Sequence, residues 1–385
     1  MRKTAVLFCL LTGIFWFSLY IYVPVVSNYA VDLGASLFFV GLISGIYGLT
    51  QMLLRIPVGM ASDRLGKLKP FIAGGVLFAA LAGLPVLFVH SAGSILACRA
   101  LGGVAAAGWV PFTVYFSTFF PPEDGPKAMG ILNASNNIGE LTAMILCGAI
   151  SGTVGRPALF GIGAAAAGGA LLLCLTVREP HRSQQNTVSL RSLAAVPFHG
   201  GLLLISSLGL LSQYIVFATV FGFTPVVAQR LGATDAQVSM MLTLFLLPAV
   251  LTSAASGRIN SKFGSRNVVF ADFILFAAAC AATPFAHGLI QLYILSVLCG
   301  MAQGSVFPVL MGLVIRYADE GKRGAAMGFF QAVYGVGMFL GPVIVGLFGS
   351  RNGGLSLGYM VTAAVGAAAA VMSLRLKPRA VCAEQ

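Results

Sequence analysis

The sequence predicts an all-α integral membrane protein with twelve transmembrane helices, arranged as two homologous halves of six. Hydrophobic residues make up 58% of the 385 residues and charged residues only 9%, whereas about a quarter of an ordinary globular chain is charged. The apolar residues gather in long stretches, and the second half of the chain repeats short segments of the first. Because so little charge cannot cover a surface in water, most of this surface must face lipid, which excludes a soluble protein.

Twelve apolar stretches are long enough to cross a bilayer, whose hydrocarbon core of about 30 Å requires about 20 residues of helix. Polar and Gly- or Pro-rich segments separate them. The first stretch follows Arg2 and Lys3 but is too long for the core of a signal peptide, so we interpret it as the first helix. The predicted helices span residues 4–26, 38–61, 70–90, 93–120, 128–152, 156–177, 200–228, 237–257, 268–287, 289–317, 325–348 and 355–375.

The basic residues predict the orientation of these helices. If the N-terminus is cytoplasmic, most of the 23 Lys and Arg residues fall in segments on that side. Only Arg156, Arg230 and Arg351 fall on the other side, while Arg55 and Arg99 lie within helices. By the positive-inside rule both termini are cytoplasmic. The net charge of +12 therefore reports orientation in the cell membrane, and basic residues scattered in this way predict no nucleic-acid partner.

An internal repeat divides the chain into two halves. Three segments recur at one constant offset without a gap: 33–35 as 231–233, 77–80 as 275–278 and 128–130 as 326–328. We predict an N-terminal six-helix half at 1–177, a central cytoplasmic loop at 178–199 and a C-terminal six-helix half with a short cytoplasmic tail at 200–385. Since six is even, both halves have the same orientation, as in membrane proteins built from parallel repeats. The interface between the repeats, near the membrane midplane, is the expected binding site.

The loop after the second helix reads GMASDRLGKLK over residues 59–69. It resembles the G-x-x-x-D-R-x-G-R/K signature of the major facilitator superfamily, and Arg99-x-x-x-Gly103 is similar to the second motif of that family. The resemblance covers the whole chain and is nearest to the branch of drug and metabolite antiporters driven by protons. One departure is that the G-x-x-x-G-P pattern usual on the fifth helix of such antiporters is absent from 139–144 and present at 337–342. Export is favoured over import despite this departure.

The resemblance implies that the loop latches the two halves in one conformational state. The residues concerned are Gly59, Asp63, Arg64, Gly66 and Lys67. Independently of the family, the two glycines permit close helix approach and a tight turn, and the basic residues hold the loop on the cytoplasmic face. Asp63 at a helix terminus can cap backbone N–H groups. The alternative is a topology anchor with one local ion pair.

Glu140 is the strongest candidate for a proton-carrying group. It lies near the middle of the fifth predicted helix, and the spacing of Asn133, Asn136, Asn137 and Glu140 places them on one helix face. A charge at a helix centre costs about 2.5 to 3.5 kcal/mol on insertion scales, so such a stripe is expected to face a polar cavity rather than lipid. A carboxyl group there can take up and release a proton. The alternative is a protonated carboxyl group that hydrogen-bonds to a neighbouring helix.

Arg99 lies within the fourth helix, nearer the outer side than Glu140, where it can bind an anionic substrate group, modulate Glu140 or bind backbone carbonyls. Arg55 and Asp272 are closer to helix ends, and we interpret them as interfacial.

In this family the helices with the other polar and aromatic residues surround the central cavity. The expected substrate cavity consists of Arg99, Asn133, Asn136, Asn137, Trp16, Tyr20, Gln213, Tyr214, Gln303, Gln331 and Tyr334.

Together these features predict a secondary active transporter that moves a small amphipathic organic molecule, anionic or zwitterionic, by alternating access, with coupling to protons and efflux as the direction. The alternatives are proton-coupled uptake or uniport of a small metabolite and a membrane sensor on a transporter scaffold.

The sequence shows no Walker loop, metal-ligand cluster or nucleophile–base pair, so we expect no enzyme activity, no catalytic residue, no metal and no cofactor. Seven scattered cysteines predict no disulfide framework. The expected partners are the substrate, protons and the lipid bilayer, and we expect a monomer.

Overall fold

The computed structural model describes residues 2–121, 125–177, 201–317, 323–351 and 354–376. Within these ranges every element is a helix, and twelve helices are long and apolar enough to cross a membrane. This confirms the predicted fold class. The predicted central loop at 178–199 and the end of the C-terminal tail lie outside the described residues.

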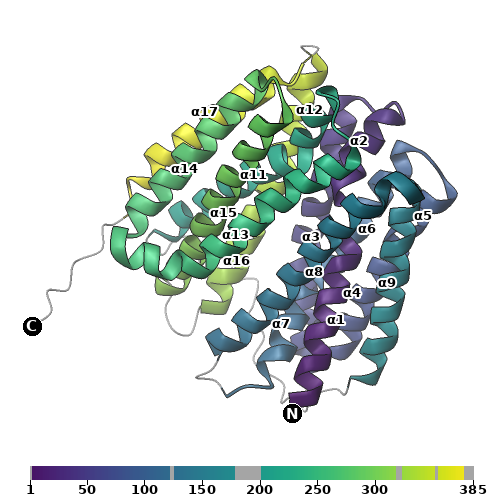
Figure 1. The fold of residues 1–385 in the computed structure, drawn as a ribbon. Coiled ribbons are helices and arrows are strands. Elements are labelled where there is room, and N and C mark those ends of the chain that lie inside the picture. The colour runs from purple at the N-terminus through teal and green to yellow at the C-terminus, as the bar shows by residue number, and fades with distance from the viewer. Residues whose placement is uncertain (1, 122–124, 178–200, 318–322, 352–353, 377–385) are drawn as a thin grey trace, which may run out of the picture.

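The first six spans, purple to blue in Figure 1, lie on one side of the molecule, and the last six, green to yellow, lie on the other. We call residues 2–177 the N-terminal half and 201–376 the C-terminal half. The first six spans are α1 (Arg2–Tyr20) with α2 (Val23–Asp32), α3 (Leu37–Leu65), α4 (Lys69–Ala82) with α5 (Leu84–Phe88), α6 (Ala92–Ala107) with α7 (Trp109–Ser117), α8 (Gly125–Val154) and α9 (Arg156–Thr176). The last six are α11 (Leu202–Ala218) with η3 (Thr219–Phe223) and α12 (Thr224–Arg230), α13 (Asp235–Phe263), α14 (Ser265–Ala282) with η4 (Thr283–Phe285), α15 (Leu289–Tyr317), α16 (Arg323–Arg351) and α17 (Ser356–Ser373).

The first span is broken into α1 and α2, whereas the sequence predicted one helix at 4–26. Pro24 has no amide hydrogen to offer the Tyr20 carbonyl, so α1 ends at Tyr20 and the helix restarts at Val23. The second piece reaches Asp32 and contacts α12 and α13 of the C-terminal half. The seventh span contains a comparable interruption, the π-helix η3, and short π-helical segments are frequent at functional sites.

The most extensive contacts between the halves are those of α3 with α16 and of α8 with α13. In the pair α3–α16, glycines on α3 allow the two backbones to approach closely because glycine has no Cβ atom. A Cβ atom on Gly45 would lie 2.7 Å from the Phe339 carbonyl oxygen, and one on Gly48 would lie 2.5 Å from the Cβ atom of Met338. Such close approaches across small residues stabilise helix pairs in membranes, where no hydrophobic effect drives helices together.

The two ends of the molecule can be defined by the helices that begin or end there. At one end α2 ends at Asp32, α9 begins at Arg156 and α13 begins at Asp235, and we call it the Arg156 end. The opposite end is where α1 begins and where α13 ends. If the termini are cytoplasmic, the Arg156 end faces the outside of the cell, and this orientation stays a prediction.

Gly103→Ala is expected to destabilise the N-terminal half. A Cβ atom on Gly103 of α6 would overlap the carbonyl group of Tyr47 on α3, only 3.0 Å from its carbon, so two packed backbones would have to separate. Overpacking of this kind costs about 1 to 3 kcal/mol, which exceeds the gain of up to about 1 kcal/mol in helix propensity. Thermal unfolding of the purified protein in detergent measures the effect.

Gly168→Ala is the matched control for this substitution. Nothing lies within 4 Å of a Cβ atom at Gly168, so the unfolding temperature of that variant should stay the same or rise. An unfolding temperature of Gly103→Ala that equals the wild-type value would contradict the tight packing of α6 on α3.

Candidate substrate and proton site

Glu140 lies midway along α8 and is buried, with 8% of the residue exposed. Its hydrogen-bonding neighbour is the hydroxyl group of Tyr20 on α1. Within the described part of the chain, no basic side chain forms an ion pair with its carboxyl group. A buried carboxyl group with a hydroxyl neighbour and no fixed cation is suited to exchange a proton when its surroundings change.

Arg99 on α6 is also buried, with 6% of the residue exposed. Its guanidinium carbon lies 4.4 Å from the centroid of the Tyr47 ring, which is a cation–π contact. The Arg99 Nε atom has no hydrogen-bond partner among the described residues. Arg99 and Glu140 are not paired directly, but both interact electrostatically with Tyr20 and with Tyr47. The structure therefore gathers the two ionisable candidates around the same two tyrosines.

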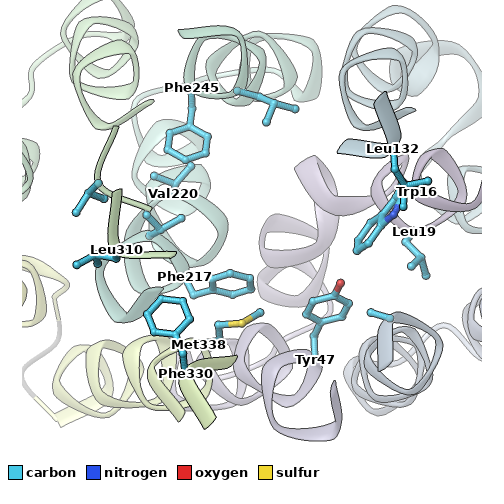
Figure 2. Packing of buried hydrophobic residues seen from close by; sticks show 14 of the residues in the cluster. Trp16, Leu19, Tyr47, Leu132, Phe217, Val220, Phe245, Leu310, Phe330 and Met338 are labelled. Carbon is cyan, nitrogen blue, oxygen red and sulfur yellow. The ribbon is translucent and has the colours of Figure 1, made fainter. Parts of the chain in front are cut away.

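Aromatic side chains meet across the boundary between the halves at this level. The Tyr47 ring stacks on Phe217 of α11 with centroids 6.4 Å apart, and the Tyr20 ring meets Phe221 of η3 edge-on at 6.3 Å. Figure 2 shows Tyr47 and Phe217 pointing toward each other from the two halves. Tyr20 and Tyr47 of the N-terminal half therefore both contact aromatic side chains of the C-terminal half.

Arg55 is buried between the halves, which differs from its predicted interfacial position. With 8% of the residue exposed, its Nη1 donates a hydrogen bond to the hydroxyl of Tyr334 on α16, and its guanidinium carbon lies 5.8 Å from the centroid of that ring. It also interacts electrostatically with Tyr47. The depth of Arg55 along α3 indicated a membrane interface, but α3 packs against α16 there, so the same depth lies inside the protein.

Tyr47 and Arg55 lie in the candidate site, although the substrate cavity predicted from the sequence does not include them. The signal that could have found them is spacing: Tyr47, Gln51 and Arg55 follow one another at intervals of four, which places them on one face of α3. All three are buried. Thus α3 contributes a polar stripe of its own to the space between the halves.

The predicted asparagine stripe on α8 is only partly buried. Asn133, nearest the opposite end, is exposed, while Asn136 and Asn137 are half-buried. The Oδ1 atom of Asn136 is buried without a hydrogen-bond partner among the described residues. The stripe therefore forms a polar line from the exposed Asn133 to the buried Glu140.

Three further predicted cavity residues have aromatic or amide groups, and of these Trp16 contacts the ring of Tyr20. Trp16 is buried, meets Trp109 edge-on with centroids 5.3 Å apart, and leaves its Nε1 atom without a partner among the described residues. Gln303 accepts a hydrogen bond from Ser212 at 2.9 Å. Gln331 is half-buried on α16, one turn before Tyr334, and so shares the helix face that binds Arg55.

Other polar residues of the C-terminal half lie within that half rather than between the halves. Tyr214 is buried on α11 with its hydroxyl group near Thr362 of α17, so the structure does not place it with the cluster around Tyr47. The adjacent Gln213 is buried. Asp272 is half-buried on α14 and accepts a hydrogen bond from Ser305 of α15 at 2.6 Å, and its interfacial position stays a prediction.

The predicted latch loop contains the turn that its sequence implies. Gly66 ends α3 with a φ angle of +61°, in the left-handed region that favours glycine. A Cβ atom on Gly59 would make only an ordinary contact of 3.4 Å. Asp63 lies in the last turn of α3, at the negative end of that helix dipole. It therefore cannot cap the N–H groups at the start of α3, and a capping role would require the start of another helix. Arg64 and Lys67 are exposed.

A polar cluster at the Arg156 end joins the halves, and the sequence analysis did not predict it. Arg156 donates two hydrogen bonds to the Asp235 carboxylate of the C-terminal half, from Nε at 2.7 Å and from Nη2 at 2.9 Å, and a third to Asp32. Gln229 of the C-terminal half donates to Asp32 at 3.0 Å. These residues are far apart in the sequence, so no local spacing pattern identifies them.

The fold and this arrangement of two halves agree with the comparison with known families. The family model of the Major Facilitator Superfamily matches residues 8–225 and again residues 206–381. The chain therefore belongs to the Major Facilitator Superfamily. It is a multi-pass transporter of the cell membrane and not an enzyme.

Curated relatives agree with the predicted drug antiporter-like branch. The chain is 26% identical to Inner membrane transport protein YajR of Escherichia coli, over 88% of this chain and 74% of that protein. It is 25% identical to Multidrug resistance protein 1 of Bacillus subtilis, over 90% of each. With Tetracycline resistance protein, class C, of Escherichia coli it shares 24% identity over 79% of this chain and 78% of that protein.

Solved structures of the same fold include a nucleoside transporter and a bacterial homologue of a lysosomal transporter. A crystal structure of the nucleoside transporter NupG has a TM-score of 0.81 at 16% identity and covers 96% of this chain and 99% of that one. A bacterial homologue of the human lysosomal transporter Spinster, in an inward-facing and unoccupied conformation, has a TM-score of 0.76 at 16% identity and covers 97% and 94%. At such low identity these similarities show the fold alone.

Proposed function

We propose that the protein exports small amphipathic organic molecules in exchange for protons, by alternating access of one site between its halves. The observation that carries this proposal is Glu140, a buried carboxyl group midway along a membrane helix. It lies beside the Tyr20 hydroxyl, and the Tyr20 ring contacts the C-terminal half through Phe221. Protonation of Glu140 can therefore affect a contact between the halves.

Exchange requires that the proton and the substrate bind in turn. A neutral hydrogen-bond donor or a cation next to Glu140 favours the ionised carboxylate, because an opposite charge or a donated hydrogen bond stabilises that form. Protonation removes this attraction and favours release of the substrate. Each half-cycle then exposes either the loaded site or the protonated site, so substrate and protons move in opposite directions.

The side chains around Glu140 suit an amphipathic organic substrate. Aromatic rings supply flat apolar surfaces and are supplemented by a few polar atoms. The groups that we propose for this site are Trp16, Tyr20, Tyr47, Arg55, Arg99, Phe217, Phe221, Gln303, Gln331 and Tyr334, with Asn133, Asn136 and Asn137 leading to Glu140.

The proposed cycle uses the predicted topology. Both termini are cytoplasmic, residues 1–177 and 200–385 form the two moving halves of a monomer, and the loop at 59–67 latches them in one state. In this orientation the Arg156–Asp235 ion pair and the Gln229–Asp32 hydrogen bond hold the outer side closed. The relatives named for multidrug and tetracycline resistance favour export.

The two buried arginines favour a second candidate, proton-coupled uptake of an organic anion. Arg99 and Arg55 both interact electrostatically with Tyr47, and both leave Nε without a partner among the described residues. An anion bound beside them would favour the protonated form of Glu140, because two negative charges in one site repel each other. Proton and anion would then cross the membrane together.

Flux measurements on the protein in liposomes distinguish the two candidates. We would impose a pH gradient and follow organic cations, neutral amphipathic molecules and organic anions of similar size. The proposal expects cations or neutral molecules to move against the direction of proton flow. Movement of anions with the protons supports uptake instead, and flux that does not respond to the pH gradient contradicts both.

A further inference from the structure

The opposite end of the C-terminal half contains a polar hollow that the transport cycle does not use. It measures about 270 Å³ and lies between the ends of α13 and α15 and the start of α14. Its polar lining comes from Ser256 and Asn260 of α13, Ser265 of α14 and Arg316 of α15. The hollow is thus separate from the cluster around Tyr47, which lies between the halves.

The lining offers hydrogen-bond donors and a positive charge. Arg316 is exposed in the last turn of α15 and has no hydrogen-bond or ion-pair partner among the described residues. Asn260 accepts a hydrogen bond from Ser265 through Oδ1 at 2.8 Å, which leaves the two N–H donors of its amide group for another acceptor. A guanidinium group together with amide donors is the combination that binds phosphate oxygens.

The internal repeat shows that the fold itself does not require this polar hollow. At the repeat offset Ser256, Asn260 and Arg316 correspond to Val58, Ser62 and Thr118, so the N-terminal half has neither the amide group nor the guanidinium group at these positions. Gly257 corresponds to Gly59. A Cβ atom on Gly59 would contact Val110, whereas nothing lies within 4 Å of one on Gly257. The C-terminal half therefore has an amide group, a guanidinium group and open space beside Gly257 at positions where the N-terminal half does not.

The charge around the hollow attracts anions. Besides Arg316, the same helix ends present Arg258, Lys262 and Arg266. The acidic residue in the described segment 251–317 is Asp272, which accepts a hydrogen bond from Ser305, and the next acidic residues in the sequence, Asp319 and Glu320, lie outside the described residues. A cluster of basic side chains at one end of membrane helices attracts anionic lipid headgroups.

Exposed apolar side chains lie next to the hollow. Phe263, three residues after Asn260, is 56% exposed, and Ile315, just before Arg316, is 45% exposed. Exposed apolar side chains next to a basic pocket match a lipid, whose phosphate enters the pocket while its acyl chains remain in the bilayer. We infer that this hollow binds the phosphate group of an anionic phospholipid through Arg316 and Asn260.

Binding of defined lipids to the purified full-length protein tests this inference. The protein in neutral detergent would be titrated with phosphatidylglycerol, with phosphatidylcholine and with glycerol 3-phosphate, and binding would be read from native mass spectra and from the unfolding temperature. We expect phosphatidylglycerol to bind most tightly. Arg316→Gln should weaken its binding at least about tenfold, because an ionised hydrogen-bond donor is lost, and Arg316→Lys should recover part of that loss.

Arg375→Gln is the matched control, since it removes one exposed basic side chain after the last span of the same half, outside the hollow. It should leave the affinity for phosphatidylglycerol unchanged. Equal losses in Arg316→Gln and Arg375→Gln, or equal affinity for the two lipids, would overturn the inference. Binding of glycerol 3-phosphate as tight as that of phosphatidylglycerol would overturn the assignment to a lipid. Unfolding temperatures of the lipid-free variants show whether they are folded.

Discussion

Glu140→Gln is expected to reduce transport driven by a pH gradient to the level of protein-free liposomes. The amide has nearly the shape of the protonated carboxyl group and can still hydrogen-bond to Tyr20, but it cannot release a proton. The protein would then keep the contact that favours one conformation and lose the step that couples the cycle to the gradient. The initial rate of substrate flux into proteoliposomes with an imposed pH gradient measures this loss.

Substrate exchange at equal pH separates coupling from binding in this variant. Exchange needs no net proton movement, so Glu140→Gln should retain it if the variant is folded and binds substrate. Asp272→Asn is the matched control, because it makes the same acid-to-amide change in a side chain that bonds to Ser305 within the C-terminal half. The control should keep gradient-driven transport. Wild-type gradient-driven transport by Glu140→Gln would show that another group carries the proton.

Arg156→Gln is expected to shift the protein toward conformations that are open at the Arg156 end. Without the guanidinium group, the Asp32 and Asp235 carboxylates face each other across the halves and repel. Hydrogen bonds to charged groups contribute about 1.5 to 3 kcal/mol, and the partial exposure of this cluster, 21% for the Arg156 side chain, lowers that contribution. A loss of about 1.4 kcal/mol changes a population ratio tenfold, so a shift of about that size is expected.

Distances between spin labels measure this shift. One label at Val154 and one at Met240, both exposed near the Arg156 end and in different halves, should report longer distances in Arg156→Gln. Arg156→Lys keeps the charge and should shift the distribution less. Arg230→Gln removes an exposed arginine at the same end and should leave the distances unchanged. An unaltered distribution in Arg156→Gln would show that the cluster does not hold this end closed.

The sequence by itself determined the membrane fold, the number of spans and the family. Long apolar stretches must become helices in lipid because every backbone N–H and C=O group needs an internal partner. The loop at 59–69 and the internal repeat are local or linear patterns, and the family comparison confirmed what they indicated. The positions of helix breaks were harder to predict from the sequence. Pro24 divides the first span into two helices, but hydropathy is high on both sides of it and so does not indicate the break.

The sequence also identified Glu140 and Arg99 as candidates, because ionisable residues inside a membrane are rare and costly. It could not separate the residues that face the space between the halves from those that face a neighbour within one half. Tyr214 and Arg55 illustrate this limit: the first lies within the C-terminal half, near Thr362, and the second bonds to Tyr334 across the halves. Both are polar residues on apolar helices. Helix periodicity predicts the side of the helix on which each residue lies, but it does not predict which other helix packs against that side.

Only the tertiary structure decided which side chains meet across the halves. It brings Arg156 to Asp235, Arg55 to Tyr334, and Tyr47 to Phe217. Each pair joins helices that are remote in the sequence, and their distance depends on how two rigid halves are oriented relative to each other. Hydropathy and spacing act along one helix, whereas this orientation follows from the close packing of α3 on α16 and of α8 on α13.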